Sequence, residues 1–333
     1  LFALYVALRG VNMTSVGEAL GQVNPGWLAL TFLLITGTLV IRALRWRVLL
    51  GKQLGFKDAF GLINIGYLIS GVLPLRAGDP ARAVGASLRG PVTAWAALAT
   101  VVVERVLDLF IMFILLLSTL PFVPGLRNYL TSNETSTFLN YQLILVLSGA
   151  LALAMLVVFV MMALVPERVE KLFRWFLVKL RLKNPDKWIK PLHNILQGFN
   201  ALSSIRDSVE VLMWSLVLWL VTALYFTTAM RACQVFIPET SLLRGTVAMW
   251  ASAFGMVFPA TGGLGSFHFA VKEALNWGFN VPGDMGFAYA VVVHAIPYIS
   301  GIVLGAVTLL MWGLSLRTLV QMSKSKDDTR ADE

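Results

Sequence analysis

Cysteine and charged residues are both scarce in this chain. Among its 333 residues there is one cysteine, and only 14% of the residues are charged. The single thiol, Cys233, excludes an intrachain disulfide, and no cysteine pair exists to hold a zinc ion. The sequence also has no Ser/His/Asp order of a hydrolase, no metal-ligand spacing and no nucleotide-binding motif. We therefore expect neither an enzyme nor an ATP-driven pump, and no cofactor or metal.

Apolar residues are abundant instead. They make up 57% of the chain, and its mean hydropathy is +0.75, whereas soluble domains are about 45–50% apolar and about 25% charged. Many of these apolar residues stand in long continuous segments, which are too long and too uniformly apolar for barrel strands. The segments are therefore expected to be membrane helices. The sequence predicts an all-α polytopic protein of the plasma membrane, with a single transmembrane domain over residues 1–333. Its expected spans are 25–41, 91–120, 138–165, 209–230 and 284–316.

Basic residues exceed acidic ones and give a formal net charge of +9. We expect no nucleic acid as a partner, because positive loops are what orient helical membrane proteins. Residues 166–208 carry nine Lys/Arg against four acids, and residues 42–57 carry five with no acid. The positive-inside rule places these two segments and the tail 317–333 in the cytoplasm, and 10–24 and 121–137 outside. The first residues, LFALYVALRG, are half a span, and we expect a truncated first helix rather than a signal peptide.

This orientation constrains residues 58–90. Because 91–120 and 138–165 form an outward and return pair, residues 58–90 must begin and end on the cytoplasmic side. Helices over 58–73 and 80–89 would be roughly 24 Å and roughly 15 Å long at 1.5 Å per residue, and both are shorter than the roughly 30 Å hydrocarbon core. The segment is therefore predicted to enter the membrane and return on the same side.

The turn of this predicted hairpin reads LPLRAGD and is followed by Pro80. Asp79 before Pro80 is a suitable N-cap and first helical residue, and Gly90 before Pro91 is a suitable stop. The alternative is that the turn merely caps two helices at the membrane surface.

The same order of features recurs later in the chain. GVLPLRAGDP (71–80) aligns with GMVFPATGGLG (255–265), which places Pro74 over Pro259. Two inverted-topology repeats, each with a re-entrant helical hairpin, match a recurring transporter architecture. The second hairpin would use 240–257 and 266–278, with Ser266 as cap. The predicted organisation is repeat 1 at about 25–120, a connecting helix and basic segment at 138–208, repeat 2 at about 209–316 and a tail at 317–333.

Three charged residues interrupt the apolar segment 91–120. Glu104 and Asp108 share a helix face, and Arg105 lies about 100° away. Ionised groups at such depth are expensive and face a partner or a wet cavity. They are therefore either part of a site or an ion-pair network that fixes helix register. The candidate partners are Arg76, Arg82, Lys272, Glu273 and His294.

Arg76 is the strongest candidate for binding an anion. It stands at the first turn, beside the N-terminus of helix 80–89 and the backbone around Gly78, which suits a phosphate. The alternative is that Arg76 extends to the surface and touches lipid headgroups nonspecifically. Arg82 is a second-tier candidate. Arg42 and Arg45 are predicted to be interfacial anchors rather than part of an entrance for anionic headgroups.

The second turn has a different character. Gly262, Gly263 and Gly265 allow close packing or positive φ angles. His268 and His294 are expected to be packed core residues, with a proton relay as the alternative. Lys272 and Glu273 are second-tier candidates for binding in this hairpin. The basic stretch 167–181 is expected to form an amphipathic helix on the inner leaflet.

Four motifs in order resemble the lysylphosphatidylglycerol synthase transmembrane region, also called the flippase-like membrane family. They are IRALRWRVLL, N…LPLRAGDPAR, ERVLD and FPATGGLG, and the resemblance covers roughly residues 25–316. Where the family has Arg-Ala-Gly-Glu, this chain has Asp79 in the acidic place. Where the family has Glu after the second turn and Arg on the last long helix, this chain has His268 and, nearby, His294. These departures suggest a differently charged, protonatable second gate.

The resemblance implies movement of a phosphate-bearing lipid, either a phospholipid or a polyprenyl-phosphate-linked lipid, between leaflets. We do not expect lysylphosphatidylglycerol synthesis, because this chain lacks the aminoacyl-transferase domain of the best-known members. A separate lipid-modifying enzyme or glycosyltransferase is a candidate partner. Two other functions stay open: a proton- or ion-coupled transporter of a small anion, and a non-transporting scaffold for a lipid-linked glycosyltransferase.

Overall fold

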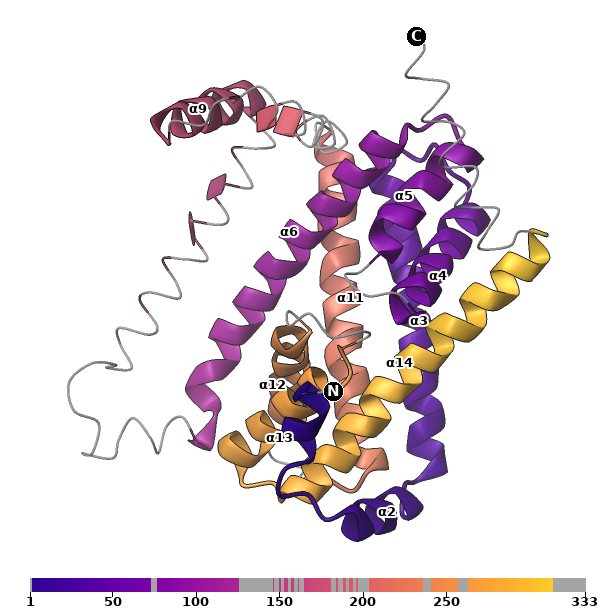
Figure 1. Ribbon diagram of the computed structural model, residues 1–333, viewed down its shortest axis with the longest axis vertical. Coiled ribbons are helices and arrows are strands. Elements are labelled where there is room, and N and C mark those ends of the chain that lie inside the picture. Colours follow the sequence, from indigo (N-terminus) through magenta and orange to yellow (C-terminus); the bar gives the residue numbers. More distant parts are fainter. Residues whose placement is uncertain are drawn as a thin grey trace. The chain divides into compact units, whose positions relative to one another are not determined.

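The computed structural model describes residues 2–72, 77–125, 165–180, 204–235, 241–256 and 263–313, with isolated positions between 146 and 196. Figure 1 shows that the regular structure in these residues is helical. The described part of the chain contains no β-strand. The predicted all-α class is therefore confirmed.

Four long helices dominate the described residues. They are α3 (Pro25–Leu49), α6 (Ala94–Thr119), α11 (Ile205–Ala232) and α14 (Gly283–Met311). By length and composition α3, α11 and α14 can each cross a membrane. α6 is as long, with 26 residues, but it carries the three charged residues discussed above. The predicted span 138–165 lies almost wholly outside the described residues.

Two pairs of shorter helices pack as hairpins. α4 (Phe56–Val72) packs against α5 (Gly78–Arg89), and α12 (Ser241–Gly255) packs against α13 (Ser266–Phe279). The existence and bounds of these helices agree closely with the prediction, because Gly and Pro residues mark the turns. α5 ends at Arg89 and Gly90 is its C-cap, as expected.

Both predicted N-caps were wrong, by two residues for α5 and by one residue for α13. α5 begins at Gly78, after Ala77, so Asp79 lies inside the first turn and its side chain does not cap the helix. Its carboxylate is bound by arginines instead. Ser266 is the first residue of α13, and the capping position belongs to Gly265, whose φ is +89°. Such an angle strains residues that have a Cβ, which explains why glycine occupies it.

The remaining described helices are short and lie near the chain's N-terminus, directly after α6, or in the basic segment. They are α1 (Phe2–Leu8), α2 (Met13–Gly21), the 3₁₀ turn η1 (Leu120–Phe122) and α9 (Pro166–Lys179). α9 is the predicted amphipathic basic helix. Its Leu172, Trp175 and Phe176 are exposed, whereas Leu177 is buried.

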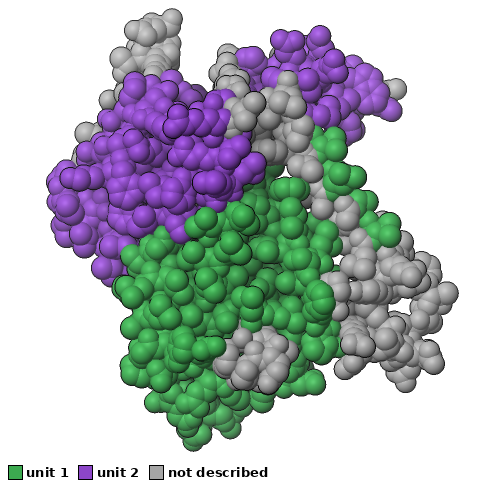
Figure 2. Space-filling model, turned by 180° about the vertical axis from the view of Figure 1, so that it is seen from behind, with its two compact units in different colours: residues 1–38, 106–160, 215–297 green, residues 39–105, 161–214, 298–333 purple. Residues whose placement is uncertain are grey.

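The chain divides into two compact units (Figure 2). Unit 1 comprises residues 1–38, 106–160 and 215–297, and unit 2 comprises residues 39–105, 161–214 and 298–333. Each of the four long helices contributes one part to each unit. Unit 1 has a core centred on Met249, Val271, Leu275 and Tyr289.

In unit 2, the close approach of α4 and α5 depends on glycine. A Cβ added at Gly78 would overlap the backbone carbonyl of Gly66 on the facing helix. The amide of Gly78 donates a hydrogen bond to Ser70 Oγ, at 3.1 Å. This contact positions the first turn of α5, which carries Asp79 and Arg82.

Candidate functional site

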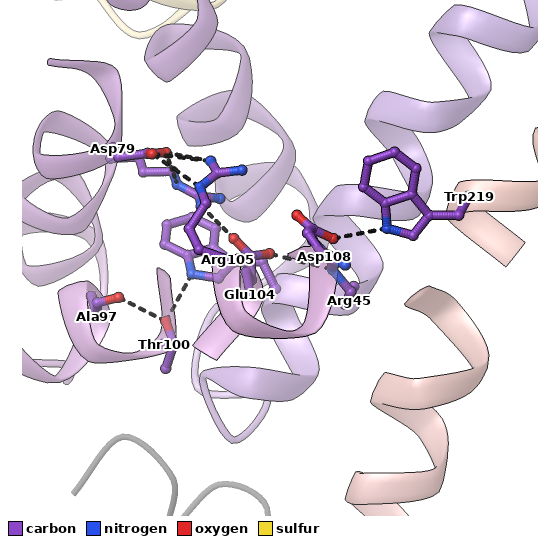
Figure 3. Close-up of polar contacts among 10 residues, drawn as sticks. Arg45, Asp79, Ala97, Thr100, Glu104, Arg105, Asp108 and Trp219 are labelled. Carbon is purple, nitrogen blue, oxygen red and sulfur yellow. Dashed lines mark hydrogen bonds and ion pairs between the residues drawn. The ribbon is translucent and has the colours of Figure 1, made fainter. Parts of the chain in front are cut away.

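A network of three arginines and two carboxylates lies within unit 2 (Figure 3). We call it the arginine network; its members are Arg45 on α3, Asp79 and Arg82 on α5, and Glu104 and Arg105 on α6. Three helices therefore supply it. All five residues lie between positions 45 and 105 of the sequence.

The inner part of the network is almost fully buried. Glu104 accepts a short hydrogen bond from Arg82 Nη2, and its other carboxylate oxygen lies 3.6 Å from Arg45 Nε. The exposed fractions of these side chains are 1% for Arg45, 7% for Arg82 and 3% for Glu104. Breaking such a buried pair by removing one partner is strongly destabilising, because a charge is left without compensation. Glu104 therefore holds two buried cations in place.

The outer part of the network is more open. Arg105 donates from Nη2 to Asp79 Oδ1 at 2.8 Å and from Nε to Asp79 Oδ2 at 3.2 Å. Arg82 Nε lies 3.5 Å from the same Asp79 Oδ1. The side chains of Arg105 and Asp79 are 39% and 24% exposed. Asp79 thus joins the buried arginine to a half-exposed one.

Trp46 contacts the arginine network through Arg82. Its indole Nε1 donates to Thr100 Oγ1 at 3.0 Å, and that hydroxyl donates to the Ala97 carbonyl at 2.7 Å. The guanidinium carbon of Arg82 lies 4.8 Å from the centre of the Trp46 ring. A cation over an aromatic face is attracted to it, most strongly where water is excluded. Trp46 therefore helps to fix the orientation of Arg82.

The open end of the arginine network carries a guanidinium group that solvent can reach, since the side chain of Arg105 is 39% exposed. Arginine guanidinium groups bind phosphate and carboxylate through two parallel hydrogen bonds. The network can therefore attract an oxyanion at its open end, where Arg105 and Asp79 are accessible.

The prediction for Gly78 needs correction. Its backbone was expected to be exposed and to contribute to anion binding, but Gly78 is buried against α4 and its amide already binds Ser70. The absence of a side chain serves helix packing here. Arg76 lies outside the described residues, and its role as an anion ligand stays a prediction.

The predictions for Arg82 and Arg45 can be compared with the structure around Glu104. Arg82 was among its predicted partners, and the structure confirms that pair. Arg45 was predicted to be an interfacial anchor, which was wrong, because it is buried against Glu104. A signal for this was present: Arg45 lies seven residues after Thr38 and four before Leu49, and both of these share its buried helix face.

Asp108 belongs to unit 1 and is not a member of the arginine network. It is buried and accepts a hydrogen bond from Trp219 Nε1 on α11, at 3.1 Å (Figure 3). The sequence analysis did not identify Trp219. A buried carboxylate with an indole donor is stabilised in place, because the charge-assisted hydrogen bond offsets part of its desolvation.

The predicted residues of the second hairpin also lie in unit 1. His268 and His294 are buried with their ring centres 4.9 Å apart. The ring of Phe267 stacks on His294 at 4.6 Å, and that of Phe287 lies 5.7 Å from His268. The expectation that both histidines pack in the core is confirmed. A proton-relay role stays untested.

The glycines and the lysine of this hairpin have clear structural roles. Gly263 and Gly265 both have positive φ angles, as expected, and a Cβ at Gly265 would overlap the backbone at Leu4. Lys272 is buried, and its Nζ lies 3.3 Å from the carbonyl oxygens of Ala7 and Arg9. It also pairs with Glu273 at 3.1 Å. Pro259 and Gly262 lie outside the described residues.

The sequence pattern of one known family matches nearly the whole chain. This family is described as the lysylphosphatidylglycerol synthase TM region, and it matches residues 1–305. The chain belongs to this family. The lysylphosphatidylglycerol synthase TM region is an integral membrane family, in agreement with α3, α11 and α14, which are each long and apolar enough to cross a membrane.

A curated relative supports the assignment. A UPF0104 membrane protein of Methanocaldococcus jannaschii is 25% identical, over 93% of this chain and 92% of its own length. No solved structure matches the chain. The predicted family resemblance is therefore confirmed.

Proposed function

We propose that this protein moves a phosphate-bearing membrane lipid between the two leaflets of its membrane. The observation that carries the proposal is the arginine network, whose accessible end places the guanidinium group of Arg105 beside Asp79 and near the buried Arg82. Ionisable side chains within a membrane protein are costly and are usually retained for function. A phosphate headgroup would bind the guanidinium groups at this end through charge-assisted hydrogen bonds.

The chemistry of the network indicates that the part of the lipid headgroup that binds is its phosphate. Arg105 already holds a carboxylate with two donors, and the same two donors match two oxygens of a phosphate. Arg82 Nε lies 3.5 Å from the carboxylate oxygen that Arg105 Nη2 binds, so it would also contribute to holding the phosphate. A neutral headgroup offers no comparable gain, because its hydrogen bonds to a guanidinium group are weaker than those of an anionic phosphate.

The two helix hairpins are the proposed moving parts. α4 and α5 are roughly 26 Å and 18 Å long, and α12 and α13 roughly 22 Å and 21 Å, at 1.5 Å per residue. All four are shorter than the roughly 30 Å hydrocarbon core. They fit two inverted repeats with re-entrant hairpins, whose rocking would give the headgroup access to one leaflet at a time. The basic segment 166–208 would lie on the cytoplasmic side.

The proposal can be tested with purified protein in liposomes. A fluorescent phosphate-bearing lipid is incorporated, and dithionite bleaches the label that is exposed in the outer leaflet. We expect bleaching beyond the outer-leaflet share for the native protein, and a loss of this excess for Arg105→Gln. A fluorescent lipid without phosphate should show no excess.

A matched control is Arg89→Gln. Arg89 is also a half-exposed arginine of unit 2 that pairs with an aspartate, Asp58, at 3.4 Å, but it lies outside the arginine network. This variant should translocate lipid like the native protein. If native protein moves neither a phospholipid nor a polyprenyl phosphate, uptake of a small anion would favour the small-anion transporter. Absence of both activities would favour the scaffold.

A further inference from the structure

The carboxylate of Asp79 lies where an oxyanion ligand of the arginine network would be expected. Its two oxygens receive both donors of Arg105, and one of them also faces Arg82 Nε. Two guanidinium groups on one carboxylate form the same kind of arrangement that binds a phosphate. An incoming phosphate and Asp79 would therefore compete for the same donors.

The two halves of the network differ in how easily they open. The Arg82–Glu104 pair is nearly excluded from water, so separating it would leave buried charges uncompensated. The Asp79–Arg105 pair is half-exposed, and ion pairs that are open to solvent contribute little net stability. The exchangeable partner of the network is thus Asp79, whereas Glu104 stays in place.

We propose that Asp79 acts as an internal counter-anion, which an incoming phosphate displaces from Arg105. The carboxylate neutralises the cations while the site is empty and returns to them when the phosphate leaves. It thereby weakens phosphate binding and promotes release, as a transporter requires. This inference rests on the proposed function, since it assumes that the arginine network binds the phosphate of the substrate.

The first test measures binding to Asp79→Asn in neutral detergent. The probes are inorganic phosphate, a short-chain phosphatidic acid and a short-chain diacylglycerol, which has no phosphate. Asparagine keeps the size of the side chain but removes its charge, so the phosphate no longer meets a like charge or competes for Arg105. We expect Asp79→Asn to bind a phosphate-bearing probe roughly tenfold more tightly than the native protein does.

The matched control for this test is Asp58→Asn. Asp58 pairs with Arg89 at 3.4 Å and is 32% exposed, so the change in charge and exposure is similar. Its affinity for each probe should equal that of the native protein. Asp79→Glu keeps the competing carboxylate and should also bind close to the native level. Tighter binding to the lipid alone identifies a headgroup site, and tighter binding to both phosphates identifies a site for free phosphate as well.

A second test needs no variant. A water-soluble carbodiimide and an amine label accessible carboxylates of the native protein, and mass spectrometry measures the labelling of each. The phosphate-bearing probe should raise the labelling of Asp79, because the displaced carboxylate becomes accessible. The labelling of Asp58 should not change.

The outcomes separate the inference from the proposed function. If phosphate binds but Asp79→Asn has unchanged or weaker affinity, or Asp79 is not exposed on binding, then the counter-anion role is wrong while the phosphate site stands. If neither native protein nor Asp79→Asn binds any phosphate-bearing probe, both are wrong. If Asp79→Asn fails to fold, the labelling of native protein alone decides.

Discussion

Replacing Glu104 with glutamine is the most informative perturbation of the arginine network. The carboxylate of Glu104 is buried between Arg45 and Arg82. Glutamine has the same shape but no charge, so Arg45 and Arg82 each lose their ion pair with Glu104. Removing one partner of a buried ion pair costs about 3–5 kcal/mol. Because two buried cations lose their ion pair with the same carboxylate, we expect a cost near the upper end of this range.

Thermal unfolding of the purified protein in detergent measures this cost. A loss of about 3–5 kcal/mol corresponds to a fall in Tm on the order of 6 °C or more. The matched control Asp58→Asn removes a half-exposed partner of Arg89 and should lower the free energy of unfolding by less than about 1 kcal/mol. The comparison isolates the effect of burial, since each change removes one negative charge.

A double variant sharpens the test. Arg45→Met in the Glu104→Gln background removes one of the two buried cations and leaves Arg82 with Asp79. We expect it to recover part of the lost stability, because a well-packed apolar side chain is often as good as a buried charge. If Glu104→Gln melts like Asp58→Asn, or if Arg45→Met lowers the Tm of Glu104→Gln further, the electrostatic account of the network is refuted.

Three further predictions concern other parts of the chain. Gly78→Ala should destabilise the protein by about 1–3 kcal/mol, because its Cβ overlaps the Gly66 carbonyl, whereas Gly283→Ala meets no atom within 4 Å and should leave the Tm unchanged. A polarity-sensitive dye on Leu172→Cys of α9 should report an apolar environment in anionic liposomes, and the same dye on Arg174→Cys should report water; equal spectra would contradict binding of α9 to the membrane surface. Hydrogen bonds to Glu210 and Asp207 raise the pKa of Lys52. The native protein should therefore be more stable than Lys52→Gln by the full amount below the ordinary lysine pKa of about 10.4, and this difference should vanish as the pH rises through the raised pKa of Lys52. A Tm difference between Lys52→Gln and native protein that persists at the highest pH would contradict this pairing.

The helix bounds were predictable because local signals set them. α3 begins at Pro25, α5 stops before Gly90, and α13 starts after a glycine-rich turn. Proline and glycine act on the chain through their own backbone geometry, so their effect can be read without knowing any distant contact.

The partners within the arginine network were only partly predictable. The pairing of Arg82 with Glu104 was among the candidates, since buried charges need partners. Arg45 was assigned to the cytoplasmic surface, because its sequence neighbours Arg42 and Arg47 suggested an interfacial group. Its burial depends on the packing of α3 in unit 2, and helix periodicity alone does not define the neighbouring helix. Asp79 was misassigned for the same reason: a local cap and a distant arginine compete for the same carboxylate, and here Arg105 binds it.

The central claim is that the protein translocates a phosphate-bearing lipid through the arginine network. The most direct measurement is dithionite bleaching of such a lipid in liposomes that contain native protein, Arg105→Gln or Arg89→Gln. The account predicts bleaching beyond the outer leaflet for native protein and Arg89→Gln, and bleaching of the outer leaflet alone for Arg105→Gln. Equal bleaching in all three proteins, or no protein-dependent bleaching in any of them, would contradict the claim.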